Sequence, residues 1–432
     1  MNETKRILRH LEEDYTEPVR DPIWKHIYLS NPLERLIHSL PFQKLHGIKQ
    51  LGPAYMVYPG ATHTRFSHSL GVFHLSRAMM TQLVQRRSIP GLTVRGVKAF
   101  LCAALLHDLG HFPFAHSLKD LNVEDHEVLT ARIILGSEAL SRIIEQELEV
   151  PPRLVAAIVD TEIDAGAENG VSFFRNLLSG MLDPDKLDYL NRDAYFCGIP
   201  YGVQDIDFIF SQIEPHASMG VTVTRKALAS VESVLFSKYL MYKYAYWHKN
   251  VRIITAMIKK AILLGLRAGK LSPDRLYNID DREFLSLTRE IDFPPFRIVD
   301  RAFRRSLYTP VLSVPFSDDN PLHRRLEELD FRIEFERRIA REAEADGNRP
   351  IPEEEVIIDI PERISFEMDL PIRDGGDTVP YPMSGSVFSA DVVQGFTRSL
   401  RTVTLLVSGS ADDIRGAQRN GLLDELRPPS PA

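Results

Sequence analysis

The chain has 432 residues, of which 44% are hydrophobic and 26% are charged, the balance of a folded globular protein with a large core. Its net charge of -7 argues against extensive binding along a nucleic-acid backbone, because that affinity comes largely from Lys and Arg side chains that displace counterions. Only two cysteines are present, which suits a reducing cytosol and excludes a disulfide framework.

The N-terminal residues and the length of the apolar runs indicate the cellular compartment of the protein. Residues 1–15 are rich in charged side chains and lack the apolar core of a secretory signal. The longest apolar stretch, near residues 97–106, is far shorter than the ~20 residues that a helix needs to cross a bilayer. We therefore expect a cytoplasmic protein that has no membrane partner.

Apolar residues recur at helical spacing through most of the first two thirds of the chain. The pattern predicts helical segments at residues 64–87, 96–109, 125–148, 185–194 and 227–268. The charged sequence at 323–345 still repeats Leu, Phe and Ile every few residues, as a helix with a solvated face does. The expected fold is therefore mainly α.

The residue composition changes beyond residue 347. Residues 356–360 form a short β-branched run, and Pro and Gly punctuate the sequence that follows. We expect a helical region at 1–320, a helical and α+β region at 321–425, and a loose tail at 426–432, whose prolines cannot continue a helix.

The stretch LLHDLGHFPFAHSL carries the most chemistry. An apolar helix there delivers the adjacent side chains of His107 and Asp108, followed by His111 and His116. An ionised carboxylate at the end of so apolar a helix needs a partner, and a metal ion is one that adjacent His and Asp can chelate. A lone His-Asp pair is more often a structural hydrogen bond, so further ligands must come from elsewhere in the chain.

Upstream, His68 falls in register with Val72, Leu75 and Met79, which places its imidazole on the buried face of a helix. A single His in such a stripe is more often a core residue than a ligand. Arg65 lies one turn earlier on the same side, however, and an anion site would explain both side chains.

Downstream, the sequence LDPDKLDYLNRD begins a helix. Asp183 is expected to cap it, Pro184 to be its first residue, and Asp185 to fall in its first turn. Lys186, Tyr189 and Asp193 then share one face, where a cation, a phenol and a carboxylate suit a phosphate and a sugar hydroxyl. The alternative is a surface helix with ordinary ion pairs.

A basic stretch follows at residues 225–270, which contains ten Lys or Arg residues and one acidic residue. Within it, Lys238, Tyr242, Tyr246 and Lys249 recur at helical steps. Such a basic and aromatic stripe suits contacts with a polyphosphate and a ring, although part of the stretch is expected to be solvated surface.

Four motifs, YPGATHTRFSHSLG, LLHDLGHFPFAHSL, DHEVLTARIIL and LDPDKLDYLNRDAYFCGIPYG, resemble in order and spacing those of the HD-domain dNTP triphosphohydrolases. This family includes bacterial relatives of the human sterile-alpha-motif and HD-domain enzyme. The similarity runs from near Asp21 through FQKLHGIKQLG and AYWHK to about Ile360, with no sterile-alpha-motif domain. It implies that the helical region at 1–320 is an HD-type catalytic core.

The resemblance implies a ligand set for one catalytic metal, formed by His68, His107, Asp108 and Asp185. Two imidazoles and two carboxylates suit one divalent transition metal, Fe, Mn, Zn or Ni, and Mg arriving with the nucleotide phosphates is also expected.

The resemblance also implies roles around the substrate, a deoxynucleoside triphosphate. His111 and His126 contact the α-phosphate, and His116 protonates the departing 5′ oxygen. The residues expected to hold the phosphates are Arg65, Lys186 and Lys238; those expected at the sugar or base are Gln50, Tyr189, Asp193 and Tyr246. Water attack at the α-phosphorus then releases deoxynucleoside and inorganic triphosphate.

Several positions depart from the human pattern. Lys119 stands where a carboxylate supports the acid histidine, and Asp120 is next to it. Lys238 replaces an Arg, which loses a bidentate phosphate contact. His38 and His46 replace residues of the guanine-nucleotide activator site, so a nucleotide effector is left open. Assembly into a dimer or tetramer is implied by the resemblance alone.

Two other functions remain as alternatives. Six side chains could hold two metals, as in some HD phosphodiesterases and oxygenases: His68, His107, Asp108, His116, His126 and Asp185. We favour the dNTP reaction because Lys186 and the basic stretch suit a polyphosphate better than a cyclic dinucleotide. A catalytically silent nucleotide sensor would be expected to have lost ligands, and all four are present.

Overall fold

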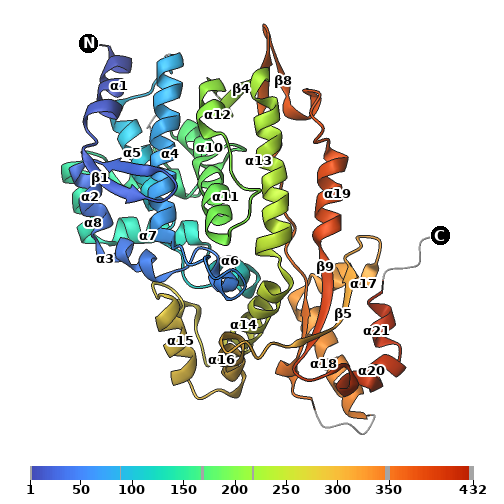
Figure 1. The fold of residues 1–432 in the computed structure, drawn as a ribbon. Helices are drawn as coiled ribbons and strands as arrows, with labels where there is room; N and C mark the ends of the chain where they lie inside the picture. The colour runs from blue at the N-terminus through green and yellow to red at the C-terminus, as the bar shows by residue number, and fades with distance from the viewer. Residues whose placement is uncertain (1, 88, 167–169, 217, 346–350, 428–432) are drawn as a thin grey trace.

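The computed structural model describes residues 2–87, 89–166, 170–216, 218–345 and 351–427. Within them helices dominate, and three small sheets complete the fold (Figure 1). The helices up to residue 303 are α1 (Glu3–Glu13), α2 (Asn31–Ile37), α3 (Leu40–Gln43), α4 (Arg65–Arg86), α5 (Val94–Leu106), α6 (Ala115–Leu118), α7 (His126–Gly136), α8 (Glu138–Arg142), α9 (Pro152–Val159), α10 (Val171–Ser179), α11 (Pro184–Cys197), α12 (Ile206–Gln212), α13 (Leu228–Met241), α14 (Lys249–Arg267), α15 (Asp281–Glu290) and α16 (Arg297–Phe303). The predicted fold class, mainly α with a smaller sheet region toward the C-terminus, is confirmed.

Helix α5 forms the centre of the helical core. Its residues are buried almost without exception from Gly96 to Leu106, as an apolar helix surrounded by other elements must be. Helix α4 packs against α5 and α11, and α9 packs against α5 and α7. Phe73 and Phe100 are fully buried there, and burial of each such side chain contributes ~1.5–3 kcal/mol. The packing holds the end of α5 beside α4 and α11.

Two of the predicted helical segments are interrupted. The segment at 125–148 divides at Ser137, whose extended backbone ends α7 and whose hydroxyl accepts a hydrogen bond from the first turn of α8. The segment at 227–268 divides after the π-helical turn Tyr242–Tyr246, because His248 has extended backbone and caps α14 with its side chain. Capping groups of this kind begin a helix locally and leave no mark on the apolar period.

The C-terminal region contains a three-stranded antiparallel sheet in the order β5 (Thr309–Pro315), β9 (Thr402–Val407), β6 (Val356–Asp359). Helices α17 (Pro321–Leu326), α18 (Leu329–Ala345), α20 (Arg415–Arg419) and α21 (Leu422–Glu425) accompany it. The run predicted as β at 356–360 is strand β6. Strand β5 precedes residue 320, so the sheet joins both sides of the predicted boundary, which stays a prediction. Of the predicted tail at 426–432, residues 428–432 lie outside the described part.

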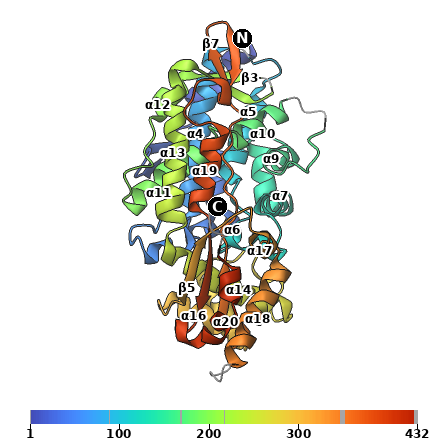
Figure 2. The same ribbon diagram turned by 90° about the vertical axis from the view of Figure 1, so that its right-hand side faces the viewer.

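Between β6 and β9 the chain leaves this sheet and runs along the helical core. It forms the hairpin β7 (Pro371–Asp374) and β8 (Asp377–Pro380), which extends the pair β3 (Ile213–His216) and β4 (Gly220–Thr224). Helix α19 (Ala390–Leu400) then returns beside α13, where the rings of Tyr239 and Phe396 stack at 4.2 Å (Figures 1 and 2). Residues 361–370, called the strap below, therefore cross the helical core.

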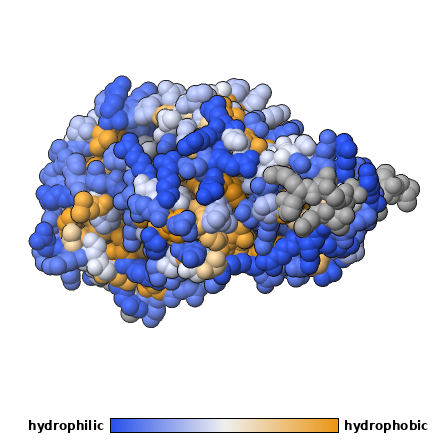
Figure 3. Space-filling view, turned by 90° about the horizontal axis from the view of Figure 1, so that it is seen from below, coloured by the Kyte–Doolittle hydropathy of each residue, from blue (hydrophilic) through white to orange (hydrophobic). Residues whose placement is uncertain are grey.

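The remaining two-stranded sheet pairs β1 (Glu17–Asp21) with β2 (Lys25–Leu29) near the N-terminus. No helix among the described residues has the length and apolar character to span a membrane. Seen from the end that carries α15, α16 and α18, the surface is mainly hydrophilic with hydrophobic residues between (Figure 3).

Candidate metal centre and active site

The loop after α5 is packed directly onto α7. The Thr130 hydroxyl donates to the His107 carbonyl oxygen at 2.9 Å and accepts from the Gly110 amide at 2.8 Å. A Cβ atom on Gly110 would lie 2.1 Å from the carbonyl oxygen of His126, so only glycine allows this approach. The loop therefore presents Asp108 and the following histidines beside the start of α7.

The four predicted metal ligands converge at the end of α5. His68, His107 and Asp185 each place one ligand atom within 4.8 Å of the others. Asp108 adjoins them, with its Oδ1 3.3 Å from His107 Nε2 and its Oδ2 4.0 Å from His68 Nε2. His68 Nε2 lies 2.9 Å from Asp185 Oδ1, so residues from three separate segments meet at one point.

One ring nitrogen of this cluster, His107 Nε2, is buried without a hydrogen-bond partner among the described residues. The other nitrogen of this ring, Nδ1, donates to the Ala104 carbonyl oxygen at 2.8 Å. Burial lowers the pKa of His68, but hydrogen bonds to Asp185 and Asp188 outweigh it and raise the pKa to about 10. A proton thus compensates the surplus carboxylate charge, and a cation held by the same atoms would fulfil that role.

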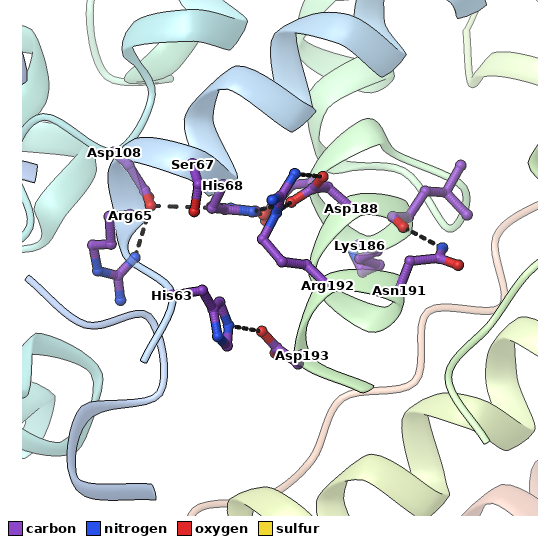
Figure 4. Close-up of polar contacts among 12 residues, drawn as sticks. His63, Arg65, Ser67, His68, Asp108, Lys186, Asp188, Asn191, Arg192 and Asp193 are labelled. Atoms are coloured by element: carbon purple, nitrogen blue, oxygen red, sulfur yellow. Dashed lines mark hydrogen bonds and ion pairs between the residues drawn. The ribbon is translucent and has the colours of Figure 1, made fainter. Parts of the chain in front are cut away.

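A second layer of side chains orients His68. Asp188 Oδ2 accepts from His68 Nδ1 at 2.8 Å and from Arg192 Nε at 2.8 Å (Figure 4). Its Oδ1 accepts from Trp24 Nε1 at 2.5 Å. Asp188 is completely buried, and a Cβ atom on Gly71 of α4 would lie 1.8 Å from its Oδ1. Helices α4 and α11 therefore approach closely at Gly71, and the buried pair fixes the His68 ring.

A cluster of three histidines adjoins the metal cluster. The rings of His111 and His126 stack at 3.9 Å, and the His116 ring lies 4.7 Å from that of His111. His111 Nε2 is 3.1 Å from Asp108 Oδ1, and Asp108, His111 and His126 form a second group that could hold a metal. Burial above all holds the pKa values of His111 and His126 well below the ordinary value, so both are neutral near pH 7.

The predicted phosphate-binding cations already have anionic or polar partners. Arg65 Nη1 donates to Asp108 Oδ2 at 2.7 Å, with both groups buried. Lys186 Nζ donates to Asp183 Oδ2 at 2.6 Å and lies 3.8 Å from Glu367 Oε1. Lys238 Nζ donates to Glu367 Oε2 at 3.1 Å, so one strap carboxylate reaches both lysines.

The predicted sugar-binding residues meet further along α11, toward its C-terminal end. Asp193 Oδ2 accepts from the Tyr246 hydroxyl at 2.6 Å, and its Oδ1 accepts from His63 Nε2 at 2.7 Å. The rings of Tyr189 and Tyr246 lie 6.5 Å apart, edge to face. The backbone N–H of Gln50 donates to the His63 carbonyl oxygen at 3.1 Å, which brings residue 50 beside His63.

The carboxylate beside Lys119, that of Asp120, pairs with two basic side chains and not with His116, the predicted acid. Asp120 Oδ1 lies 2.6 Å from Lys259 Nζ, and Asp120 Oδ2 lies 3.1 Å from Arg332 Nη2. Lys119 itself pairs with Asp125 at 3.3 Å. The short loop that follows His116 is therefore tied to α14 and α18 instead.

Sequence reasoning missed His63, Asp188, Arg192 and Glu367. Asp188 and Arg192 had a signal, because they follow Asp185 at helical spacings that bring Asp188 onto the buried side. His63 lies in a quoted motif but precedes the helix, so no periodicity marks it. Glu367 is about 180 residues from Lys186 in the chain, and no local pattern connects them.

Parts of the chain match two sequence models of known protein families and several known proteins. A sequence model of the HD domain matches residues 65–169, and one described as an HD associated region matches residues 215–387. The chain is 31% identical over 309 residues to an uncharacterized protein of Methanocaldococcus jannaschii, covering 71% of this chain and 62% of that one. It is 28% identical over 298 residues to the human deoxynucleoside triphosphate triphosphohydrolase SAMHD1, covering 61% of this chain and 48% of that protein.

The matched region thus spans only about half to three fifths of these relatives' lengths. A solved structure of a hypothetical protein from Aquifex aeolicus has the same fold, with a TM-score of 0.68 and 24% identity, and the match covers 95% of this chain and 99% of that one.

Proposed function

Because the chain belongs to the HD-domain proteins related to the deoxynucleoside triphosphate triphosphohydrolases, with an HD-associated region after the HD domain, we propose that it is a metal-dependent phosphohydrolase that converts dNTPs to deoxynucleoside and inorganic triphosphate. The observation that carries the proposal is the convergence of His68, His107 and Asp185 on one point, with the buried His107 Nε2 unpartnered in the part of the chain that the structure describes. Asp108 adjoins this group, because its Oδ1 lies 3.3 Å from His107 Nε2.

These four residues suit a divalent transition metal, Fe, Mn, Zn or Ni. When bound, such an ion supplies Lewis-acid activation of water and compensates phosphate charge. Asp188 and the Ala104 carbonyl oxygen hold the two imidazoles with their Nε2 atoms toward the cluster, as outer partners of ligating histidines do.

The neighbouring side chains suit an α-phosphate. His111 and His126 are neutral imidazoles, each with one N–H to donate to a phosphate oxygen, and Arg65 adds a fixed positive charge beside them. Burial, followed by the charge of Arg65, lowers the pKa of His116 next to them to about 4, so an anionic phosphate must raise this pKa before the imidazole can take up a proton and donate it to the departing 5′ oxygen.

The outer phosphates and the deoxynucleoside, on either side of the α-phosphate, would both meet residues of α11 and of the segment after it. Lys186 and Lys238 converge on the Glu367 carboxylate, and the outer phosphates of a triphosphate would take the place of that anion. Mg bound to those phosphates would neutralise part of their negative charge. Asp193, Tyr189, Tyr246 and Gln50 then line the place for the deoxyribose and base.

A second candidate function rests on the group formed by Asp108, His111 and His126, which could hold a second metal as in bimetallic HD phosphodiesterases. The number of tightly bound metal ions per chain distinguishes the two. One ion supports the dNTP reaction, and two ions together with turnover of a cyclic dinucleotide support the phosphodiesterase.

The test of the proposed function is the His107→Ala variant of the metal-loaded protein, with His26→Ala, an exposed histidine of β2, as matched control. We expect His107→Ala to lose its metal and at least a hundredfold in dNTP turnover, because the ligand set is incomplete. His26→Ala should keep both the metal and the turnover. Equal turnover in the two variants would exclude the proposed site.

Assembly and effectors follow from the resemblance and stay predictions. A homo-oligomer, dimer or tetramer, and a nucleotide effector are both tested by light scattering of the protein with and without GTP. A mass that stays at that of one chain, 49.1 kDa, under every condition would contradict assembly.

A further inference from the structure

The carboxylate of Asp193 is held on both sides by donors from different elements. His63, in the loop before α4, donates from Nε2 to Oδ1 at 2.7 Å (Figure 4). Tyr246, in the turn after α13, donates from its hydroxyl to Oδ2 at 2.6 Å. Burial and the Asp193 charge hold the pKa of Tyr246 well above its ordinary value, so the phenol stays a donor. Two bonds from opposite sides fix the rotation of the carboxylate and leave each oxygen a further lone pair.

The position of His63 is itself fixed. Its ring stacks on that of Phe196 at 4.6 Å, and its side chain is fully buried. Its carbonyl oxygen accepts from the backbone N–H of Gln50, and the bridge between Lys49 and Thr64 continues this contact. The pairing of residues 49–50 with residues 63–64 thus places the backbones of His63 and Gln50 side by side.

Two polar atoms in this place lack partners. His63 Nδ1 and Gln50 Oε1 are both buried, and neither forms a hydrogen bond with any residue that the structure describes. A buried polar atom without a partner destabilises a fold by ~1–3 kcal/mol. The two open acceptors indicate that a ligand with hydroxyl or amino groups completes the site.

We propose that His63 is a positioning residue that orients Asp193 toward the 3′ hydroxyl of the bound deoxynucleotide and so determines the preference for ligands that carry this hydroxyl. The inference rests on the proposed function, because that function places the sugar at Asp193. His63 does not touch the reacting phosphate and acts through the Asp193 carboxylate.

The test compares dATP with 2′,3′-dideoxyATP in two variants of the full-length, metal-loaded protein. His63→Leu removes the donor and keeps most of the volume, and His63→Gln retains an N–H that can reach Asp193. The matched control is His10→Leu, because His10 lies in α1, far from the site in the chain, and contacts Asp14 at 2.6 Å and the Tyr15 hydroxyl at 3.1 Å. The readouts are kcat/KM and, by calorimetry, Kd.

A hydrogen bond to a charged acceptor contributes ~1.5–3 kcal/mol, so the wild-type protein should prefer dATP over the dideoxy compound roughly tenfold or more. We expect His63→Leu to reduce this preference to less than about threefold, with the loss confined to dATP, and His63→Gln to restore most of it. The His10→Leu preference should equal that of the wild type even if its melting temperature falls.

Three results would overturn the inference. One is a wild-type protein that does not distinguish the two nucleotides, and another is a His63→Leu variant that weakens both by the same factor, as a purely structural role would. The third is an unchanged preference in a folded His63→Leu variant. Failure of the proposed function is separate: binding without turnover in the wild type would refute hydrolysis, and the Kd ratios would still decide the role of His63.

Discussion

The strap carboxylate of Glu367 should weaken the binding of a triphosphate. Its two oxygens lie 3.1 Å from Lys238 Nζ and 3.8 Å from Lys186 Nζ, and both lysines are largely buried. An incoming polyphosphate must break these contacts before it can bind the same ammonium groups. Replacement of Glu367 by Gln removes the competing charge and keeps the side-chain volume.

The magnitude follows from the one short contact. A hydrogen bond between charged groups contributes ~1.5–3 kcal/mol, and the Glu367 side chain is 33% exposed, so solvent screening favours the lower end of that range. At 1.4 kcal/mol for each factor of ten, Glu367→Gln should bind inorganic tripolyphosphate roughly tenfold more tightly than the wild type.

Calorimetric titration with tripolyphosphate measures this effect without turnover. The control is Glu362→Gln in the same strap, because Glu362 pairs with Arg252 at 3.7 Å and not with the two lysines. We expect the control to bind as the wild type does. Equal or weaker binding by Glu367→Gln would refute the view that this carboxylate occupies the phosphate position.

Three further predictions concern the frame of the site. Gly110→Ala should destabilise the protein by ~1–3 kcal/mol in urea unfolding, because its Cβ would meet the His126 carbonyl oxygen, whereas Gly136→Ala, with open space around it, should not. Asp188→Asn should weaken metal affinity ~10–100-fold in a chelator competition, because it removes the outer partner of a ligating histidine. Burial, followed by the charge of a neighbouring arginine, lowers the pKa of Lys44 to about 8 from 10.5 in the unfolded chain. The folded state therefore loses this proton at a lower pH than the unfolded chain, and its stability rises with pH between these two pKa values. Between pH 7 and 9.5 the free energy of unfolding of the wild type should rise by ~2 kcal/mol relative to that of Lys44→Met.

Each of these has a contrary outcome. Equal urea midpoints for the two alanine variants would mean that the loop does not pack on α7 as described. Unchanged metal affinity in Asp188→Asn would show that the carboxylate serves the helix contact alone. A difference between wild type and Lys44→Met that is independent of pH would show that the ammonium group is as well solvated in the folded state as in the unfolded one.

Local sequence patterns could predict the helices and the ligand types. The register of His68 with apolar residues placed it on the buried face of a helix, and the Asp-Pro pair before Asp185 located the start of α11. Both signals act within one or two turns of the chain. The same is true of the short β-branched run that became β6.

Contacts between distant segments could not be predicted. The apolar period across 227–268 contains no sign that His248 ends one helix and begins another, and Tyr246 lies in a π-helical turn instead of a regular stripe. The meeting of Glu367 with Lys238 depends on the route of the strap, which tertiary packing sets. The role of His63 could be inferred only from its hydrogen bond to Asp193, 130 residues away in the chain.

The identity of the reaction products tests the central claim most directly. Metal-loaded protein is incubated with each dNTP, and separately with GTP and cyclic dinucleotides, and the products are separated by anion-exchange chromatography. We predict deoxynucleoside and inorganic triphosphate in equal amounts from dNTPs, with none formed by His107→Ala. Nucleoside monophosphates as the products, or no turnover with any metal or effector, would contradict it.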